Sequence, residues 1–307
     1  MDNEIVAKLR EVLADSQWTQ EQLAYNLKVS FSTLNAWLNS KSTPRTGAVK
    51  AIDDMYLTIV GRTEIDPILL ADTKKRALSK HITVREIVTN EELLDKVTLY
   101  LTYHTNTIEG STMTLSDVKE VLDDDNKVLA NKTAKEQTEA RNHRTALYYL
   151  LDELNAQGKD FKWTKDLILN THLRMMNTLI SNAGMFRNHG VRIVGSAVPL
   201  ANYARIPDYI DELIIDLNAK ENDIIENMAK VHSRFEGIHP FSDGNGRTGR
   251  LIMFLQALQS GLVPPLIIKE RKRAYYRYLE TAHMDGNYSL LALFVAESIL
   301  SADKLIK

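Results

Sequence analysis

The chain has 307 residues, of which 44% are hydrophobic and 25% are charged, as is usual for a globular protein. The formal net charge of −2 gives it no general affinity for polyanions, and the absence of cysteine excludes disulfides, thiolate catalysis and zinc–thiolate sites. No signal-peptide pattern opens the sequence and no apolar run reaches about eighteen residues, so we expect a cytoplasmic protein that does not enter a membrane. With only 13 glycines and 7 prolines, and with long stretches of helical period, the sequence predicts an all-α fold.

The N-terminal segment, residues 1–58, is predicted to be a small helix-turn-helix domain. Its apolar residues recur at helical spacing, and Thr19 and Ser30 are suitable N-caps for two short helices joined by a tight turn. This pattern resembles the lambda-repressor-like helix-turn-helix, except that Lys28 stands where the turn usually has glycine. A side chain costs more than glycine does in a left-handed turn, so we expect slight strain there.

The resemblance implies that this domain could bind DNA, with base contacts tentatively assigned to Ser32, Thr33 and Asn35. Residues 28–50 include four basic residues and no acidic one. Residues 1–60, however, contain 6 basic and 7 acidic residues, so phosphate contacts would be few and strong binding would need a dimer. The sequence leaves DNA binding and contacts with another protein equally open.

Residues 59–92 are predicted to form a helical linker, and residues 93–307 a second domain. The second domain opens with a helix near residues 93–110, where apolar residues are three or four positions apart. Gly110 suits the position that follows a helix C-terminus, which places Glu109 at the helix end. Taken alone, a glutamate in such a place is usually solvated.

Three more helices are expected in the second domain, at residues 136–154, 208–218 and 221–235. Between the first and the second of them lies a short run, Val191 to Val194, in which apolar residues alternate with others between two glycines. Alternation with this period is typical of a β-strand, so we expect a short strand there.

The most informative segment is residues 239–250, His-Pro-Phe-Ser-Asp-Gly-Asn-Gly-Arg-Thr-Gly-Arg. Its glycines let backbone N–H groups turn toward one point, and the N-terminus of the helix that follows adds free N–H donors and partial positive charge. Asp243 can hold a divalent cation through oxygen, and Arg247 and Arg250 can clamp phosphates. His239 can take up a proton near neutral pH. Together these features predict phosphoryl or nucleotidyl transfer.

Two other phosphate- or metal-binding loops do not fit this segment. An EF-hand beginning at Asp243 would need glycine in place of Thr248 and glutamate in place of Phe254. A P-loop is excluded because the sequence contains no GxxxxGK[ST]. An Asp-Gly-Asn-Gly run is by itself also an ordinary turn sequence.

The whole segment matches every fixed position of the Fic family signature, His-x-Phe-x-(Asp/Glu)-Gly-Asn-Gly-Arg-x-x-Arg. The resemblance implies a Fic-type helical core with one small β-hairpin flap. It also implies a protein adenylyltransferase, which transfers AMP from ATP, with Mg²⁺ as cofactor, to a Ser, Thr or Tyr hydroxyl of a target protein or of itself. His239 would be the catalytic base, Asp243 the magnesium ligand, and Phe241 would pack into the core. The loop residues implied in nucleotide binding are Gly244, Asn245, Gly246, Arg247, Thr248, Gly249 and Arg250.

A second motif, Thr-Asn-Thr-Ile-Glu-Gly at residues 105–110, resembles the inhibitory motif of the family, Ser/Thr-x-x-x-Glu-Gly/Asn. The resemblance implies that Glu109 pairs with Arg250 and takes the guanidinium that the γ-phosphate needs. The motif lies N-terminal to the core, as in the subclass whose inhibitory helix precedes it. The chain would then inhibit itself.

The remaining implied contacts concern the flap and the adenine base. The flap would dock an extended target segment by β-augmentation. The flap residues that would edge the nucleotide pocket are Val191, Arg192, Ile193 and Val194. Tyr275 falls where the family lines its adenine pocket, although His283 stands where asparagine is common. By themselves, the flap residues also fit an ordinary surface hairpin, and Tyr275 also fits a core aromatic.

Other functions stay open. The same site could remove AMP from modified proteins, with Glu109 positioning a water. The chain could instead be a DNA-binding regulator whose Fic core senses a nucleotide. The donor could be UTP or CDP-choline, because a phosphate cradle does not read the base. A homodimer is a further expectation.

Overall fold

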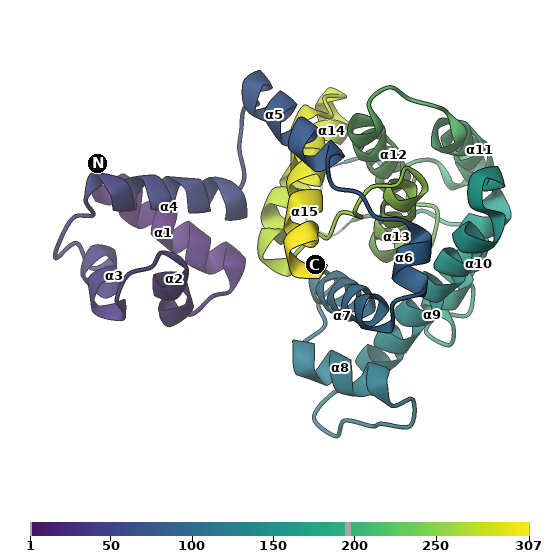
Figure 1. The fold of residues 1–307 in the computed structure, drawn as a ribbon, viewed down its shortest axis with the longest axis horizontal. Helices are drawn as coiled ribbons and strands as arrows, with labels where there is room; N and C mark the ends of the chain where they lie inside the picture. Colours follow the sequence, from purple (N-terminus) through teal and green to yellow (C-terminus); the bar gives the residue numbers. More distant parts are fainter. Residues whose placement is uncertain (1, 194–197, 307) are drawn as a thin grey trace. The chain divides into compact units, whose positions relative to one another are not determined.

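The computed structural model of the protein describes residues 2–193 and 198–306. Over these ranges the chain forms helices joined by loops, and it contains no β-strand, only an isolated bridge between His81 and Leu262 (Figure 1). The expected all-α fold is therefore confirmed. In the same ranges, no helix combines the length and the apolar character needed to cross a bilayer.

The chain divides into two compact units. The first comprises residues 1–65 and 268–278, and the second comprises residues 66–267 and 279–307. Residues 268–278 thus belong with the N-terminal helices, whereas the sequence analysis placed them in the second domain.

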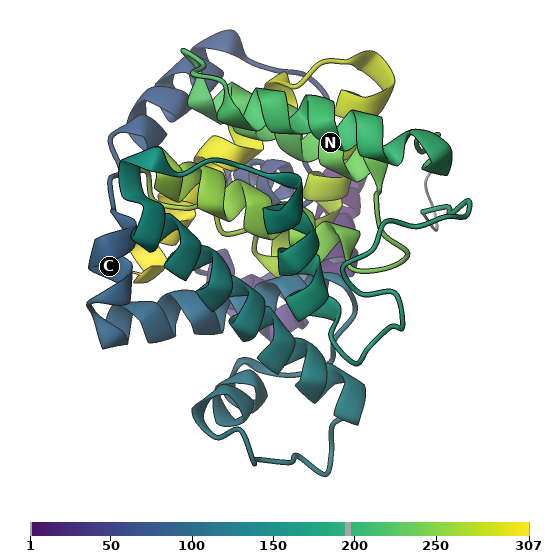
Figure 2. The same cartoon turned by 90° about the vertical axis from the view of Figure 1, so that its right-hand side faces the viewer.

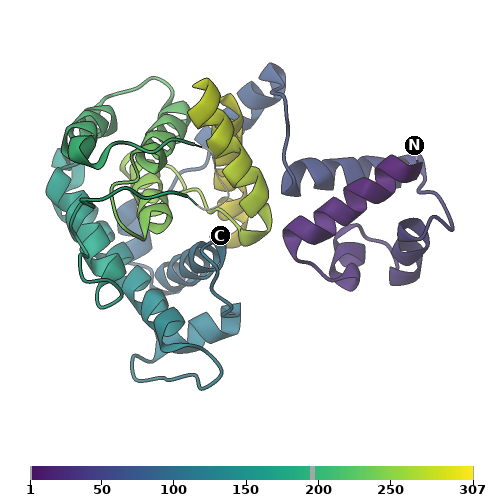
Figure 3. The same ribbon diagram turned by 180° about the vertical axis from the view of Figure 1, so that it is seen from behind.

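The first unit contains four helices at its N-terminal end. They are α1 (Asp2–Ser16), α2 (Gln20–Asn26), α3 (Phe31–Leu38) and α4 (Thr46–Ile59). The predicted N-caps are present: the Thr19 side chain accepts a hydrogen bond from the Gln22 N–H, and the Ser30 side chain accepts one from the Thr33 N–H. Lys28, between α2 and α3, has a φ of 57°, the left-handed conformation that the sequence predicted to be costly without glycine. Helix α1 packs against α4, as Figure 3 shows in purple and blue.

Within its described residues, the second unit contains ten helices of its own and shares an eleventh helix, α14, with the first unit. They are α5 (Pro67–Leu78), α6 (Val84–Val88), α7 (Glu91–Ile108), α8 (Leu115–Asp123), α9 (Ala134–Gln157), α10 (Lys165–Met176), α11 (Ile206–Asn218), α12 (Ile224–Ile238), α13 (Asn245–Gln259), α15 (Ser289–Ile306) and the shared α14 (Lys272–Asp285). Helices α7, α9, α11 and α12 correspond to the four that the sequence predicted, with small differences at their ends. The described residues also form three short 3₁₀ helices, at Gly158–Asp160, Tyr203–Arg205 and Lys269–Arg271.

Helix α13 is the centre of the second unit. Nearly all of its residues are buried, as expected of a helix that is covered on every side. It packs against α7, α9, α10 and α12, and α9 and α10 in turn lie side by side (Figure 2, teal). The segment 239–250 begins in the turn between α12 and α13 and ends in the first turns of α13, so the predicted site lies at the N-terminus of the central helix.

Local signals in the sequence explain where the helices next to this loop begin and end. Helix α9 starts in a capping box in which Thr133 and Glu136 bond each other's backbone N–H groups. Burial acts to raise the pKa of Glu136, but its hydrogen bonds from Thr112 and Thr133 lower that pKa to about 2. Helix α7 ends at Glu109, after which Gly110 takes a φ of 105°.

The predicted hairpin is not confirmed. Residues 191–193 have no regular secondary structure, and Val194 lies outside the described residues. The alternating pattern of this run fits a strand, but a strand needs a paired neighbour, and an isolated two-stranded hairpin is marginal in water. No strand of the described chain is available to pair with it.

Candidate active site

His239 caps the C-terminus of α12 in the left-handed conformation, with φ 50° and ψ 60°. Such a conformation is uncommon for a residue other than glycine, and it turns the chain sharply out of the helix. The ring Nδ1 lies 3.2 Å from the carbonyl oxygen of Glu236, which can only accept a hydrogen bond. Nδ1 therefore carries the proton in the neutral ring, and Nε2 keeps its lone pair. Burial lowers the pKa of His239, and the charge of Arg187 lowers it further, so the ring is neutral at pH 7.

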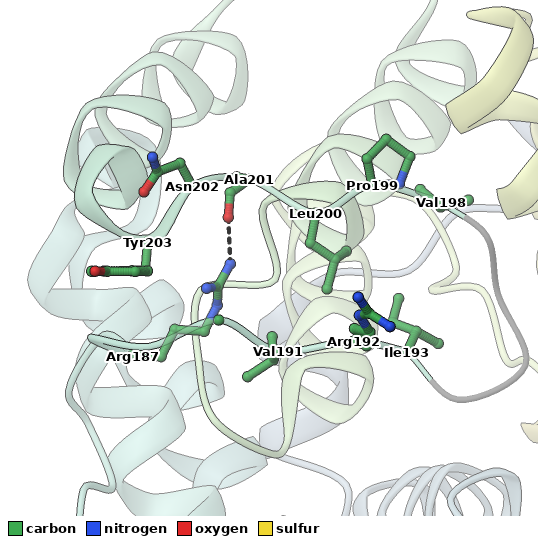
Figure 4. A pocket seen from close by; sticks show the side chains of 11 residues that line it. Arg187, Val191, Arg192, Ile193, Val198, Pro199, Leu200, Ala201, Asn202 and Tyr203 are labelled. Carbon is green, nitrogen blue, oxygen red and sulfur yellow. Dashed lines mark hydrogen bonds between the residues drawn. The ribbon is translucent and has the colours of Figure 1, made fainter.

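Arg187 anchors the start of the loop through hydrogen bonds to backbone carbonyl oxygens. Its guanidinium is buried and donates hydrogen bonds to the carbonyl oxygens of His239, His189 and Ala201, each at 2.7 Å (the last is drawn in Figure 4). Its backbone N–H donates to the carbonyl oxygen of Pro240 at 2.9 Å. Burial lowers the pKa of Arg187. The arginine thus fixes the backbone on both sides of the base, although no sequence pattern had singled it out.

Phe241 and Asn245 brace the middle of the loop. The Asn245 side chain accepts a hydrogen bond from the Phe241 N–H and donates one to the Phe241 carbonyl oxygen, both at 2.8 Å. Phe241 is fully buried, as expected, and stacks on the ring of His172 with 3.6 Å between centroids. The Asn245 side chain thus holds the loop, and its backbone N–H belongs to the helix N-terminus that can bind a phosphate.

His172, on α10, connects the loop to the segment that precedes the expected flap. Its Nδ1 accepts the N–H of Gly184 at 2.9 Å, so its Nε2 carries the proton and donates to the carbonyl oxygen of Asp243 at 3.0 Å. Burial lowers the pKa of His172 to about 4. The ring therefore stays neutral near pH 7 and keeps both hydrogen bonds.

Asp243 presents a carboxylate at the N-terminus of α13. Its side chain is 50% exposed, and Oδ1 accepts hydrogen bonds from the Gly244 N–H at 2.6 Å and from Arg247 Nη2 at 3.3 Å. Across the described residues there is no group of three or more His, Cys, Asp or Glu side chains that could hold a metal ion. One carboxylate that completes its ligand set with substrate phosphates is nevertheless a common way to bind Mg²⁺, and Asp243 fits that description.

The two arginines of the loop signature are both ion-paired. Arg247 Nη1 lies 3.0 Å from Glu139 Oε1, and its side chain is only 4% exposed. Arg250 Nη2 lies 2.5 Å from Glu109 Oε1, so the predicted ion pair is present. Arg250 Nε also donates to the hydroxyl of Thr105 at 2.7 Å, which means that the first and fifth residues of the second motif both hold this guanidinium.

The Glu109 carboxylate lies over the first turn of α13. A Cβ atom built on Gly246 would come within 2.5 Å of Glu109 Oε1 and within 3.0 Å of Arg250 Nη1. The carboxylate therefore lies beside the first turn of the helix, close to the end where partial positive charge attracts an anion. Only the missing side chain of Gly246 leaves room for it there.

A buried carboxyl, that of Glu236, lies close to His239, and no sequence motif pointed to it. Its Oε2 lies 3.9 Å from His239 Nδ1, and its Oε1 has no hydrogen-bond partner among the described residues. Burial raises the pKa of Glu236 to about 8, with Arg250 acting to lower it and Glu109 to raise it. Glu236 is therefore uncharged at neutral pH. Its place against Gly249 explains why the helix has no side chain at that position.

Other residues with predicted roles are placed as follows. Thr248 and Gly249 are buried within α13, and their part in nucleotide binding stays a prediction. Tyr275 belongs to the first unit, and its contact with adenine stays a prediction. On α3, Ser32 and Asn35 are exposed, and Thr33 is half-buried and bonded to Ser30. 

The described flap residues border a pocket of about 610 Å³ (Figure 4). Val191, Arg192 and Ile193 form one side of it, and residues 198–203 form the other. Arg187 also contributes to its lining, but no residue of the 239–250 loop is among the lining residues. The pocket therefore adjoins the site through Arg187 and is not itself the place of the base and the arginines.

Several known proteins resemble this chain. Residues 162–257 match the Fic/DOC family. The protein adenylyltransferase fic-1 of Caenorhabditis briggsae is 31% identical over 203 residues, which are 64% of this chain and 38% of that protein. The protein adenylyltransferase Fic of Aedes aegypti is 31% identical over 199 residues, 64% of this chain and 39% of that protein. The chain thus matches less than half the length of these curated relatives.

The fold agrees with this relationship. The solved structure of Fic-1 from C. elegans superposes with a TM-score of 0.65 at 22% identity, over 93% of this chain and 84% of that one. A likeness at this identity establishes the fold alone. The complete loop signature, the matched family region and the shared helical fold agree, and residues 162–257 of the chain are a Fic/DOC family region.

Proposed function

We propose that the second unit transfers AMP from Mg²⁺-bound ATP to a hydroxyl side chain of a protein, and that Glu109 restrains this reaction. The observation that carries the proposal is the Glu109–Arg250 ion pair beside the first turn of α13, the helix whose N-terminus would receive phosphates. His239, neutral and with Nε2 free to accept, ends the preceding helix. The names of the curated relatives, protein adenylyltransferases, support the same chemistry.

In the proposed reaction, His239 Nε2 accepts the proton of the target hydroxyl as its oxygen bonds to the α-phosphorus. The bond from the α-phosphorus to the oxygen that bridges to the β-phosphate breaks, and pyrophosphate leaves. Asp243 would hold Mg²⁺, which supplies neutralisation of phosphate charge. The backbone N–H groups at the start of α13, with Arg247 and Arg250, would bind and orient the phosphates.

Glu109 would restrain transfer because it occupies Arg250. The carboxylate is one-third exposed while the guanidinium is 4% exposed, so the ion pair lies at the edge of the site and Glu109 is the partner that can leave. With the pair closed, a γ-phosphate would lack this arginine and would meet a negative charge. ATP would then bind weakly or in an unproductive position.

ATP labelled at either its α- or its γ-phosphate tests the chemistry. We expect purified Glu109→Gly protein to acquire the α-label on itself or on an added protein but not the γ-label, and the Glu109→Gly/His239→Ala protein to acquire neither. Transfer of the γ-label instead would show a kinase. Label transferred only from UTP or CDP-choline would change the donor. Loss of AMP from modified protein, abolished by Glu109→Gly, would favour the removal reaction.

A second function is supported by the first unit: binding of DNA through α3. Ser32 and Asn35 are exposed on this helix, and the four basic residues Lys28, Lys41, Arg45 and Lys50 are all exposed as well. Cations on such a surface would contact phosphates, while the exposed polar side chains of α3 would face the bases. The slope of log affinity for a DNA duplex against log salt concentration would give the number of these phosphate contacts. Unchanged affinity in a Lys41→Ala/Arg45→Ala protein would refute this role.

A further inference from the structure

Glu139 makes a largely buried ion pair with the 239–250 segment, although it lies outside both motifs. It lies on α9, before the segment that matches the Fic/DOC family, and 108 positions before Arg247. The Glu139 side chain is 12% exposed and that of Arg247 is 4% exposed, with 3.0 Å between Oε1 and Nη1. Charged groups are rarely removed from water in this way without a close partner.

Arg247 is shared between two carboxylates. Its Nη1 donates to Glu139 at 3.0 Å, and its Nη2 donates to Asp243 at the longer distance of 3.3 Å. Its Nε has no hydrogen-bond partner in the described part of the chain. Two single contacts, one to each acid, therefore fix the orientation of this guanidinium.

Removal of the Glu139 charge would leave Arg247 with Asp243 as its one acidic partner. A guanidinium can turn both of its outer nitrogens onto a single carboxylate and pair with it in the bidentate manner. Each Asp243 oxygen would then have a lone pair engaged by the guanidinium, and the carboxylate would face a full positive charge at close range, so it would hold a cation less well. Within the described chain, the one other charged side chain paired with Glu139 is Lys135, at 3.9 Å. Lys135 is a cation and is 65% exposed, so it cannot provide Arg247 with a second acidic partner.

We propose that Glu139 is a positioning residue for the metal site: it holds Arg247 back, so that Asp243 stays available to a divalent cation. This inference rests on the proposed function, which assigns the cation to Asp243. It is independent of Glu109, because Glu109 bonds Arg250 and not Arg247.

The test uses the whole chain in the Glu109→Gly background, with Mn²⁺ and the α,β-methylene analogue of ATP as probes. Dissociation constants for Mn²⁺ would be measured by electron paramagnetic resonance. Glu139→Gln, which keeps the shape and removes the charge, is expected to weaken Mn²⁺ binding by about tenfold. Glu153→Gln, the same change farther along α9 where the carboxylate bonds only Gln157 among the described residues, is expected to leave it unchanged.

Kinetics supply a second readout that a purely structural role would not move. With Glu139→Gln, the Mg²⁺ concentration for half-maximal AMP transfer should rise by a similar factor, while kcat at saturating Mg²⁺ stays close to that of the parent. Mn²⁺ affinity equal to that of the parent, in a protein with an unchanged thermal midpoint, would overturn the inference. Should Glu139→Gln fail to fold, Glu139→Asp is used, and there too an unchanged affinity would refute the role.

The parent protein separates the two claims. A Glu109→Gly protein that binds the analogue and Mn²⁺ but shows no effect of Glu139→Gln refutes the positioning role alone. A Glu109→Gly protein that binds neither probe and transfers no AMP refutes the proposed function, whatever Glu139 does.

Discussion

His239 combines a left-handed backbone position with a largely buried ring, and both properties affect how it would act as a base. The turn directs the ring out of α12, and Arg187 fixes the carbonyl oxygens around it. Burial penalises the imidazolium, so the neutral ring persists to a pH below the ordinary value of 6.5. A base with this property is ready to accept a proton throughout the neutral range.

A pH profile of kcat in the Glu109→Gly protein tests this reasoning. Because the pKa of His239 is lowered, activity should be retained as pH falls to 6.5 and should be lost only below it, as the ring becomes protonated. The profile would be recorded with saturating ATP and Mg²⁺ over the acid range. An acid limb centred at or above pH 6.5 would contradict a buried, neutral base.

Gly249 tests the packing around the buried Glu236. A Cβ atom at this position would come within 2.6 Å of Glu236 Oε1 and 3.0 Å of a ring carbon of Phe235. We expect Gly249→Ala to destabilise the second unit by about 1–3 kcal/mol through overpacking. Gly47→Ala is the matched control, since nothing lies within 4 Å of a Cβ there. If urea unfolding gives Gly249→Ala and the parent the same free energy of unfolding, the Glu236 side chain can move aside without a loss of stability.

The residues of the loop signature could be named from the sequence because they are contiguous. Their partners could not, because Glu139, Arg187 and Glu236 come from other elements and carry no recognisable spacing. The sequence did identify Glu109, since the second motif is itself contiguous. Which arginine it would reach followed from the family resemblance and not from the residues alone.

At the scale of helices, the end of α7 controls where Glu109 lies. Gly110 has a φ of 105°, and its N–H and that of Ser111 bond the carbonyl oxygens of Thr107 and Asn106, which closes the last turn. A Cβ at Gly110 would meet nothing within 4 Å, so the only obstacle to a side chain is the backbone conformation itself.

Gly110→Ala should therefore loosen the restraint without touching the site. An L-residue in this conformation costs roughly 1–2 kcal/mol, and rearrangement of the turn would move Glu109 away from Arg250. We expect more AMP transfer than in wild type and less than in Glu109→Gly. Gly190→Ala, where φ is not positive and the space is open, should behave as wild type. Transfer by Gly110→Ala at the wild-type level would contradict this account.

Helices with clear periodicity and caps could be predicted from the sequence, as α7, α9, α11 and α12 were. Helix α15 was not predicted, because residues on nearly all of its sides are buried and its sequence shows no single apolar stripe. The strand at Val191 was expected from a local alternation, but the pairing that makes a strand is not local. Helix α10 has a good N-cap in Thr164, a signal that was present and not used.

At the scale of the whole molecule, buried titratable groups of the second unit make stability depend on pH. Four of them have strongly shifted pKa values, and the lowered pKa of His239 acts in the same direction as those of the other buried histidines. Burial lowers the pKa of His143 and of His232 to about 3 and that of His172 to about 4, and it raises the pKa of Glu236 to about 8. The unfolded chain binds protons on the histidines below pH 6.5, where the folded chain does not. It also loses the proton of Glu236 above pH 4.5, where the folded chain keeps it.

Stability should therefore pass through a maximum near pH 6.5. As pH falls from 6.5 to 5, each of the three histidines removes about 1.4 kcal/mol per pH unit, and Glu236 offsets one of them. As pH rises from 6.5 to 8, the histidines have no further effect and Glu236 lowers stability by about 1.4 kcal/mol per unit. Urea unfolding of the second unit at pH 5, 6.5 and 8 would measure this. A free energy of unfolding that does not fall between pH 6.5 and 5 would contradict it.

The division into units is a further feature that the sequence alone does not reveal. Residues 268–278 join the first unit although about 200 residues of the second unit separate them from residues 1–65. In this segment the Tyr278 hydroxyl accepts the N–H of Arg62, and Arg271 donates to the carbonyl oxygen of Thr58. Contacts this distant along the chain leave no local pattern, so composition and periodicity could not reveal them.

The most direct test of the central claim compares wild type with Glu109→Gly for the AMP that each transfers from α-labelled ATP with Mg²⁺. Because Glu109 is ion-paired with Arg250 beside the first turn of α13, we predict little label on protein with wild type and much more with Glu109→Gly. Absence of label on any protein with Glu109→Gly, the protein itself included, would contradict the claim that this loop is a restrained site of AMP transfer.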